Sequence, residues 1–149
     1  MRRLFLVFVA AFLMTACGPN QTDKSLTESD AYDRVEAYIR RAATALPPGA
    51  HLEAASAPSS VACKGEPAGH VMVVSTYFVR GVPYDDKEVD TMLTWWKAHD
   101  FELLDDLRPQ RHYVWVQNKS DRFRMSLRDN ETGELLLAAE SPCLISASG

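Results

Sequence analysis

The sequence lacks the motifs by which most enzymes and metal sites are identified. No serine lies in a Gly-x-Ser-x-Gly pattern, and no cysteine is placed with a histidine in a nucleophile motif. Four histidines are present, but no two of them have metal-ligand spacing on one predicted element: His51, His70, His99 and His112. We therefore expect no catalytic residues, no metal and no cofactor.

The chain also has little excess charge of either sign and no internal repeat or low-complexity segment. Its 149 residues are 46% hydrophobic and 24% charged, which is the composition of one ordinary globular domain. With 16 basic and 20 acidic residues, the formal net charge is −4. A mildly acidic domain has no electrostatic attraction to nucleic acid, so nucleic-acid binding is not expected.

Long apolar runs are absent except near the N-terminus. Arg2 and Arg3 precede an uninterrupted apolar run over residues 4–14, and the small Thr15 and Ala16 follow it. A run of about a dozen residues is too short to span a ~30 Å bilayer comfortably, which favours a signal peptide over a transmembrane helix.

The stretch Met14-Thr15-Ala16-Cys17 resembles the lipobox of bacterial lipoproteins, in which Leu, then Ala or Ser, then Gly or Ala precede the cysteine. Met14 takes the place of the usual Leu. The resemblance implies cleavage before Cys17 and a diacylglyceryl thioether on its sulfur, usually with a third acyl chain on the new amine. Two or three acyl chains form a stable anchor. The alternative is a secreted protein in which Cys17 is a free thiol.

This interpretation divides the chain into three parts. Residues 1–16 are the signal peptide, residues 17–28 are the lipidated cysteine with a flexible tether, and residues 29–149 are a single globular domain. A flexible coil of the tether's length reaches on the order of 20 Å. We therefore expect the domain to stay close to the extracytoplasmic face of the cell membrane.

Cysteine is scarce, and the count of three is odd until Cys17 is assigned to the lipid. Cys63 and Cys143 then remain as an even pair in an exported chain, where disulfides persist. We expect them to form a disulfide that closes a loop of roughly 80 residues, worth about 4 kcal/mol in loop-closure entropy. The alternative is two free, buried thiols.

The first part of the domain is predicted to be a helix. Its apolar residues recur at three- and four-residue steps, Ser29 or Asp30 can cap its start, and Pro47-Pro48-Gly49 ends it. The residues of the apolar stripe are Tyr32, Val35, Ile39, Ala42 and Leu46.

The remaining patterns predict an α+β domain. Residues 71–79, rich in β-branched and aromatic side chains, predict a central strand covered on both faces, and residues 85–99 predict a second helix. A weak strand is expected over residues 52–56, and residues 57–60 are expected to be a loop. Period-two patterns predict further strands over 101–104, 113–117, 123–128 and 135–139. The predicted order is helix-strand-strand-helix followed by a four-stranded meander, with both helices on one face of a mostly antiparallel sheet.

A hairpin turn over residues 118–121 would pair Gln117 with Arg122 and Trp115 with Arg124. It would place an apolar face against the helices, formed by Val114, Val116, Phe123, Met125 and Leu127. Placing Leu127 opposite Leu135 extends that face to Leu137 and Ala139. The opposite face would carry aromatic and arginine side chains, a composition enriched in binding hot spots: Tyr113, Trp115, Arg122, Arg124 and Arg128. A structural alternative is that Arg128 pairs with Glu134 and the arginine stems cover the aromatic rings.

The layout as a whole resembles small actinobacterial lipoproteins of the LppA-like kind. Five features carry this resemblance: Cys17, Cys63, the Trp95-Trp96 helix, Phe123 to Leu127, and Cys143-Leu144. The resemblance implies a lipoprotein with a helix-then-meander domain, and it implies no catalytic residue.

These observations together predict a membrane-anchored binding or accessory module of the cell envelope. Its partner would be an envelope protein or another envelope ligand, and the membrane itself is contacted through the lipid. An envelope hydrolase without a recognisable motif is the alternative.

Replacing Cys17 by alanine should release the protein from membranes, because the substitution removes the thioether that holds the acyl chains. Fractionation of cells expressing the wild type and the C17A variant measures this directly. Unchanged membrane retention of the variant would refute the lipid anchor.

Overall fold

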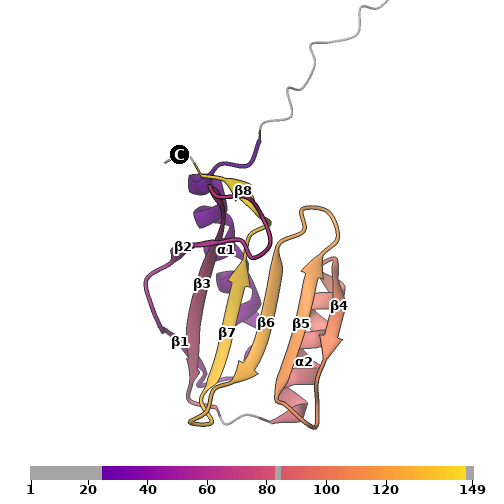
Figure 1. Ribbon diagram of the computed structural model, residues 1–149. Coiled ribbons are helices and arrows are strands. Elements are labelled where there is room, and N and C mark those ends of the chain that lie inside the picture. Colours follow the sequence, from indigo (N-terminus) through magenta and orange to yellow (C-terminus); the bar gives the residue numbers. More distant parts are fainter. Residues whose placement is uncertain (1–24, 83–84, 147–149) are drawn as a thin grey trace, which may run out of the picture.

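The computed structural model of the protein describes residues 25–82 and 85–146. The Met14-Thr15-Ala16-Cys17 stretch and most of the predicted tether lie outside these residues, so the anchor stays a prediction. In chain order the elements are α1 (Glu28–Ala42), the 3-10 turn η1 (Ala43–Ala45), β1 (His51–Ala54), β2 (Ser59–Ala62), β3 (His70–Arg80), α2 (Asp86–Ala98), β4 (Phe101–Asp106), β5 (Tyr113–Asn118), β6 (Arg124–Asp129), β7 (Leu135–Glu140) and β8 (Leu144–Ile145). Figure 1 shows their arrangement.

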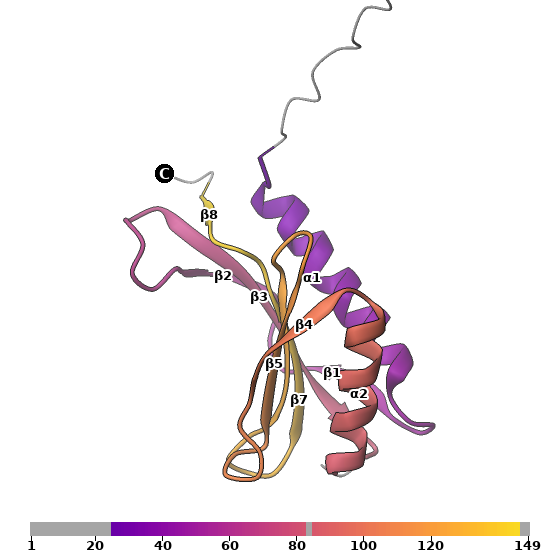
Figure 2. The same ribbon diagram turned by 90° about the vertical axis from the view of Figure 1, so that its right-hand side faces the viewer.

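The strands form one eight-stranded antiparallel sheet in the order β1-β3-β7-β6-β5-β4, with β2 and β8 both paired to β3. Both helices lie on the same side of this sheet (Figure 2). The predicted α+β class with helices on one face of an antiparallel sheet is therefore confirmed. Neither helix of the described residues is long and apolar enough to cross a membrane.

Helix α1 begins at a capping box. The Thr27 hydroxyl accepts a hydrogen bond from the Asp30 backbone N–H, and the Asp30 carboxylate accepts one from the Thr27 N–H. The N-cap is therefore Thr27 and not the expected Ser29 or Asp30, which both lie in the first turn of the helix, with Asp30 as the capping-box partner of Thr27. The face of α1 that packs on the sheet consists of Ala31, Val35, Tyr38, Ile39 and Ala42.

Helix α2 begins where the sequence predicts. The Asp85 carboxylate accepts a hydrogen bond from the Lys87 N–H, which satisfies one of the unpaired donors of the first turn. Val89, Met92 and Trp96 are buried along one stripe, while the Trp95 ring stacks on the His99 ring at its side.

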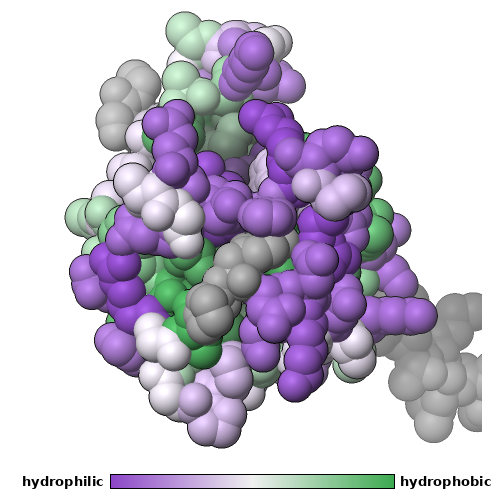
Figure 3. All heavy atoms as spheres, turned by 90° about the horizontal axis from the view of Figure 1, so that it is seen from below, coloured by the Kyte–Doolittle hydropathy of each residue, from purple (hydrophilic) through white to green (hydrophobic). Residues whose placement is uncertain are grey.

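The surface at the lower end of the molecule, as Figure 1 shows it, is mostly hydrophilic, with hydrophobic residues gathered near the middle of that view (Figure 3).

The core lies between the helices and one face of the sheet. The predicted core face of the strands is confirmed, since each of its residues is at most 3% exposed: Val114, Val116, Phe123, Met125, Leu127, Leu135, Leu137 and Ala139.

The predicted hairpin register is wrong by two residues. Gln117 pairs with Arg124, and Leu127 pairs with Leu137. The faces are nevertheless correct, because a shift of two residues keeps every side chain on its side of the sheet. A shift of one residue would have exchanged the core and the open face.

Strand β3 differs from its prediction. It lies inside the sheet, but the helices cover only one of its faces, so its even-numbered side chains stay partly exposed. With 11 residues it extends beyond β1 and β7, and this extension is paired by β2 on one edge and β8 on the other. Residues 59–60, expected in a loop, therefore belong to a strand, and the predicted element order lacks both short strands.

The disulfide between Cys63 and Cys143 is present, as predicted. Cys63 directly follows β2 and Cys143 directly precedes β8, so the bond joins the two short strands that pair with the extension of β3. The Cys63 N–H also donates a hydrogen bond to the His70 carbonyl. The bond thus closes an 80-residue separation at the end of the sheet where α1 begins.

Reducing this bond should lower the free energy of unfolding by about 4 kcal/mol, because the unfolded chain regains the entropy of an open loop. Urea unfolding with and without reductant, together with a Cys63→Ser/Cys143→Ser double variant, measures the loss. Thiol titration of the unfolded, unreduced protein should find neither cysteine reactive, and two free thiols would contradict the assignment.

Candidate functional site

The candidate site is the face of the sheet that the helices leave uncovered. Strand register places Thr76, Ala138, Ser126 and Trp115 side by side across this face on four adjacent strands. A parallel row brings Arg128 next to Tyr113. We call this surface the open face.

Four of the five predicted face residues lie on it: Tyr113, Trp115, Arg124 and Arg128. Arg122 does not. It precedes β6 in a left-handed conformation, with φ of 63°, and its N–H donates to the Asn118 carbonyl inside the turn. The prediction for Arg122 was wrong because the turn extends through residue 123, which removes this side chain from the strand.

Two aromatic residues of the open face are stacked on each other. The rings of Tyr113 and Trp115 are nearly parallel, at 19°, with centroids 6.3 Å apart. The Arg124 guanidinium lies 5.2 Å from the Trp115 ring centroid and forms an ion pair of 3.0 Å with Glu140. These contacts hold the Arg124 and Trp115 side chains in place, so the surface around them is preorganised.

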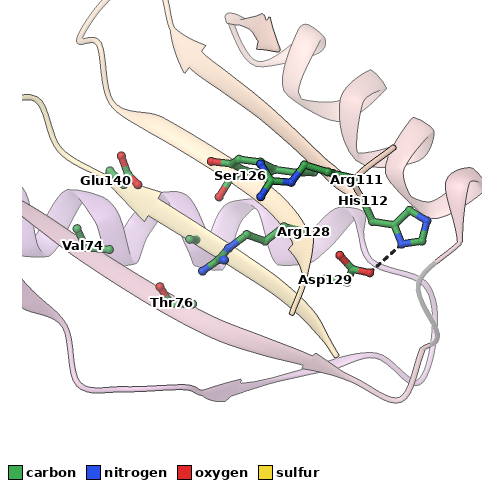
Figure 4. Close-up of a pocket in the computed structure, with 10 residues that line it drawn as sticks. Val74, Thr76, Arg111, His112, Ser126, Arg128, Asp129 and Glu140 are labelled. Atoms are coloured by element: carbon green, nitrogen blue, oxygen red, sulfur yellow. Dashed lines mark hydrogen bonds and ion pairs between the residues drawn. The ribbon is translucent and has the colours of Figure 1, made fainter. Parts of the chain in front are cut away.

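A polar hollow of about 330 Å³ lies on the open face next to this stack. Its lining comes from the middle of the sheet and from the segment before β5 (Figure 4): Val74, Thr76, Arg111, His112, Tyr113, Ser126, Arg128, Asp129, Ala138 and Glu140. A second hollow, of about 600 Å³, continues past the ends of the strands and shares Arg111, His112, Arg128 and Asp129 with the first.

His112 and Asp129 form a pair at the rim of the hollow. The His112 Nδ1 lies 2.8 Å from a carboxylate oxygen of Asp129, and the Asp129 N–H donates to the His112 carbonyl. His112 is one of four histidines scattered along the sequence, and Arg111, Ser126 and Asp129 were not predicted to belong to a site. The β5–β6 register could have predicted this pair. Because Tyr113 pairs with Arg128, the residues next to them, His112 and Asp129, lie opposite one another.

Arg128 does not pair with Glu134, contrary to the structural alternative considered for it. The Glu134 carboxylate instead forms an ion pair with Arg80, which also pairs with Glu53. The side-chain amide of Asn130, in the same loop as Glu134, donates a hydrogen bond to that carboxylate. Within residues 25–82 and 85–146, neither Arg128 nor Arg111 has a carboxylate at ion-pair distance. Two guanidinium groups therefore line the hollow without a carboxylate partner.

The electrostatics around Tyr113 keep its hydroxyl protonated. Partial burial raises the pKa of Tyr113 above its usual value of 10, and the negative charge of Glu140 raises it further. The positive charge of Arg128, a hydrogen bond from Ser126 and the positive charge of Arg124 act in the opposite direction and are outweighed. The phenol is thus a neutral group at physiological pH that can donate a hydrogen bond into the hollow.

One further hollow, of about 410 Å³, lies between α2 and β4 and is mainly apolar. Leu93, Trp96, Phe101 and Leu103 line it, so it offers few polar groups to orient a ligand. No group of three or more potential metal-ligating side chains occurs in the part of the chain that the structure describes. The polar hollow is therefore the better candidate site.

Comparison of the chain with protein-family models, with curated proteins and with solved structures found no match. The function must therefore be argued from the open face itself.

The Arg80–Glu134 pair predicts an acid-dependent loss of stability. Hydrogen bonds from Arg80, Asn130 and Thr132 lower the pKa of Glu134 from 4.5 to about 2. Because the pKa is lower in the folded protein, the stabilisation is complete above pH 4.5 and is lost as the pH falls towards 2. In Glu134→Gln, urea unfolding should show a smaller loss of free energy over this range than in the wild type.

Glu131→Gln is the matched control, since Glu131 lies on the same loop and has no ion pair within the described residues. It should lose stability over this range as the wild type does. An identical acid loss in Glu134→Gln and the wild type would contradict the assigned role of the pair.

Proposed function

We propose that the protein is a lipid-anchored, non-catalytic binding module at the outer face of the cell membrane, and that its open face binds a component of the cell envelope. The observation that carries this proposal is the polar hollow, where stacked aromatic rings adjoin two arginines that form no ion pair within the described part of the chain. The lipobox-like stretch and the disulfide of an exported chain support the location.

The composition of the open face suits binding. Tyrosine, tryptophan and arginine are the residues that most often dominate the free energy of association, because they offer large contact areas with few rotatable bonds per contact. Here Tyr113 and Trp115 are already stacked, and Arg124 is fixed by Glu140. Binding would thus cost little conformational entropy in these side chains.

The orientation of the site favours a ligand away from the bilayer. The chain enters α1 at the end of the molecule where β8 also lies, whereas β5 starts with Tyr113 near the opposite end (Figure 1). If the membrane anchor is attached through a tether before α1, the hollow lies towards the end of the domain that is away from the bilayer. A component of the envelope outside the membrane can reach it there.

An envelope hydrolase is the second candidate, and the His112–Asp129 pair beside the hollow is the observation that favours it. A hydrolase of this type needs a nucleophile within reach of the imidazole. Figure 4 shows the His112 ring at the end of the hollow beside Asp129, whereas Ser126 lies farther in on β6. This separation favours the binding function.

Crosslinking of the protein in intact cells, followed by its purification, tests the proposal. Trp115→Ala should lose the crosslinked products of the wild type, because it removes the central ring of the open face. Trp95→Ala is the matched control, since Trp95 is an equally large, partly buried ring on α2, away from the open face.

Trp115→Ala must first be shown to keep its disulfide and its cooperative thermal transition. If a folded Trp115→Ala protein forms the same crosslinks as the wild type, the open face is not the binding surface.

A further inference from the structure

Two arginines from adjacent segments extend into one hollow, and neither forms an ion pair with a carboxylate of residues 25–82 or 85–146. Arg111 comes from the segment before β5 and Arg128 from β6, and Figure 4 shows both side chains lying over the sheet within the hollow. We propose that this hollow binds an oxyanion, a carboxylate or phosphate group carried by the ligand. The inference rests on the proposed function and names the chemistry of its ligand.

The charges that face the hollow leave a positive excess. Arg124 is neutralised by Glu140 at 3.0 Å, and Asp129 is the one remaining carboxylate of the lining, placed beside His112 at the rim. Counting only these arginines and carboxylates, Arg111, Arg124 and Arg128 stand against Asp129 and Glu140, a local charge of +1. The whole chain has a net charge of −4. The hollow is therefore a positively charged site in an acidic protein, which favours the approach of an anion to this surface.

The available donors suit an oxyanion more than a cation or a neutral apolar group. A guanidinium presents parallel N–H groups that match the oxygens of a carboxylate or phosphate, and such charge-assisted hydrogen bonds are among the strongest in proteins. The hydroxyl groups of Thr76 and Tyr113 also line the hollow and can donate to further oxygens. No lysine is among the lining residues.

The hollow has room for more than a simple ion. Its volume of about 330 Å³ lies at the lower end of the range for small-molecule sites, roughly 300–1,000 Å³. The adjoining hollow past the strand ends shares both arginines, so a larger ligand has space to continue beyond the anion. An oxyanion attached to a sugar-sized body would fit this arrangement.

Isothermal titration calorimetry of the full-length protein in detergent, in a phosphate-free buffer of low ionic strength, tests the inference. The probes are glucose 1-phosphate and glucuronate, with glucose as the neutral control. We expect saturable binding of at least one anionic sugar, no binding of glucose, and weaker binding as salt is added. The preferred anionic probe identifies the group as phosphate or carboxylate.

Arg111→Gln and Arg128→Gln should each weaken this binding by about tenfold or more, since each removes a charged donor from the hollow. Arg122→Gln is the matched control, because it removes the same charge from an exposed turn residue outside the hollow, and it should leave the affinity unchanged. Absence of binding by both anionic sugars, or equal weakening by Arg122→Gln, would overturn the inference.

This outcome is separable from that of the crosslinking experiment. If Trp115→Ala loses its crosslinks while no anionic sugar binds, the open face binds a ligand of other chemistry and the oxyanion inference fails alone. If an anionic sugar binds through Arg111 and Arg128 while Trp115→Ala keeps its crosslinks, the oxyanion site stands and the proposed partner surface fails.

Discussion

Burial of only one side of the sheet is the constraint on which the rest of this structure depends. Neighbouring side chains along a strand point to opposite faces, so sealing Val114, Val116 and Leu127 under the helices forces Tyr113, Trp115 and Arg128 to the other side. The apolar core and the open face are thus one arrangement seen from its two sides. The side chains of the open face are therefore those that alternate with the core residues along each strand.

Strand β3 joins this arrangement to the end of the molecule where α1 begins. It pairs with β1 and β7 over one part of its length and with β2 and β8 over the other. The disulfide ties β2 and β8 together across it, so the short strands do not depend on their few hydrogen bonds alone. The domain therefore presents one continuous, cross-linked sheet, which suits a surface whose donors must hold their positions.

The sequence predicted the helices, the main strands and both faces, because hydrophobic period and capping residues are local signals. The faces were assigned correctly although the hairpin register was wrong. Gln117 pairs with Arg124 and not with Arg122, and a shift of two residues keeps each side chain on its face. The short strands β2 and β8 were missed because their pairing follows from the length of β3. The polar hollow was predicted only in part. Arg111 and His112 line it because of their tertiary placement, which no local pattern indicates. Arg128 lacks the expected ion pair with Glu134 because Arg80, far away in the sequence, pairs with Glu134.

Site-specific photo-crosslinking in intact cells tests the central claim, that the open face is the binding surface, most directly. A photoreactive residue at Gln117, on the open face beside Arg124, is compared with one at Asp33, which is exposed on α1 on the helix side. The structure predicts specific crosslinks from position 117 and none from position 33. Crosslinks from position 33 alone would contradict the account.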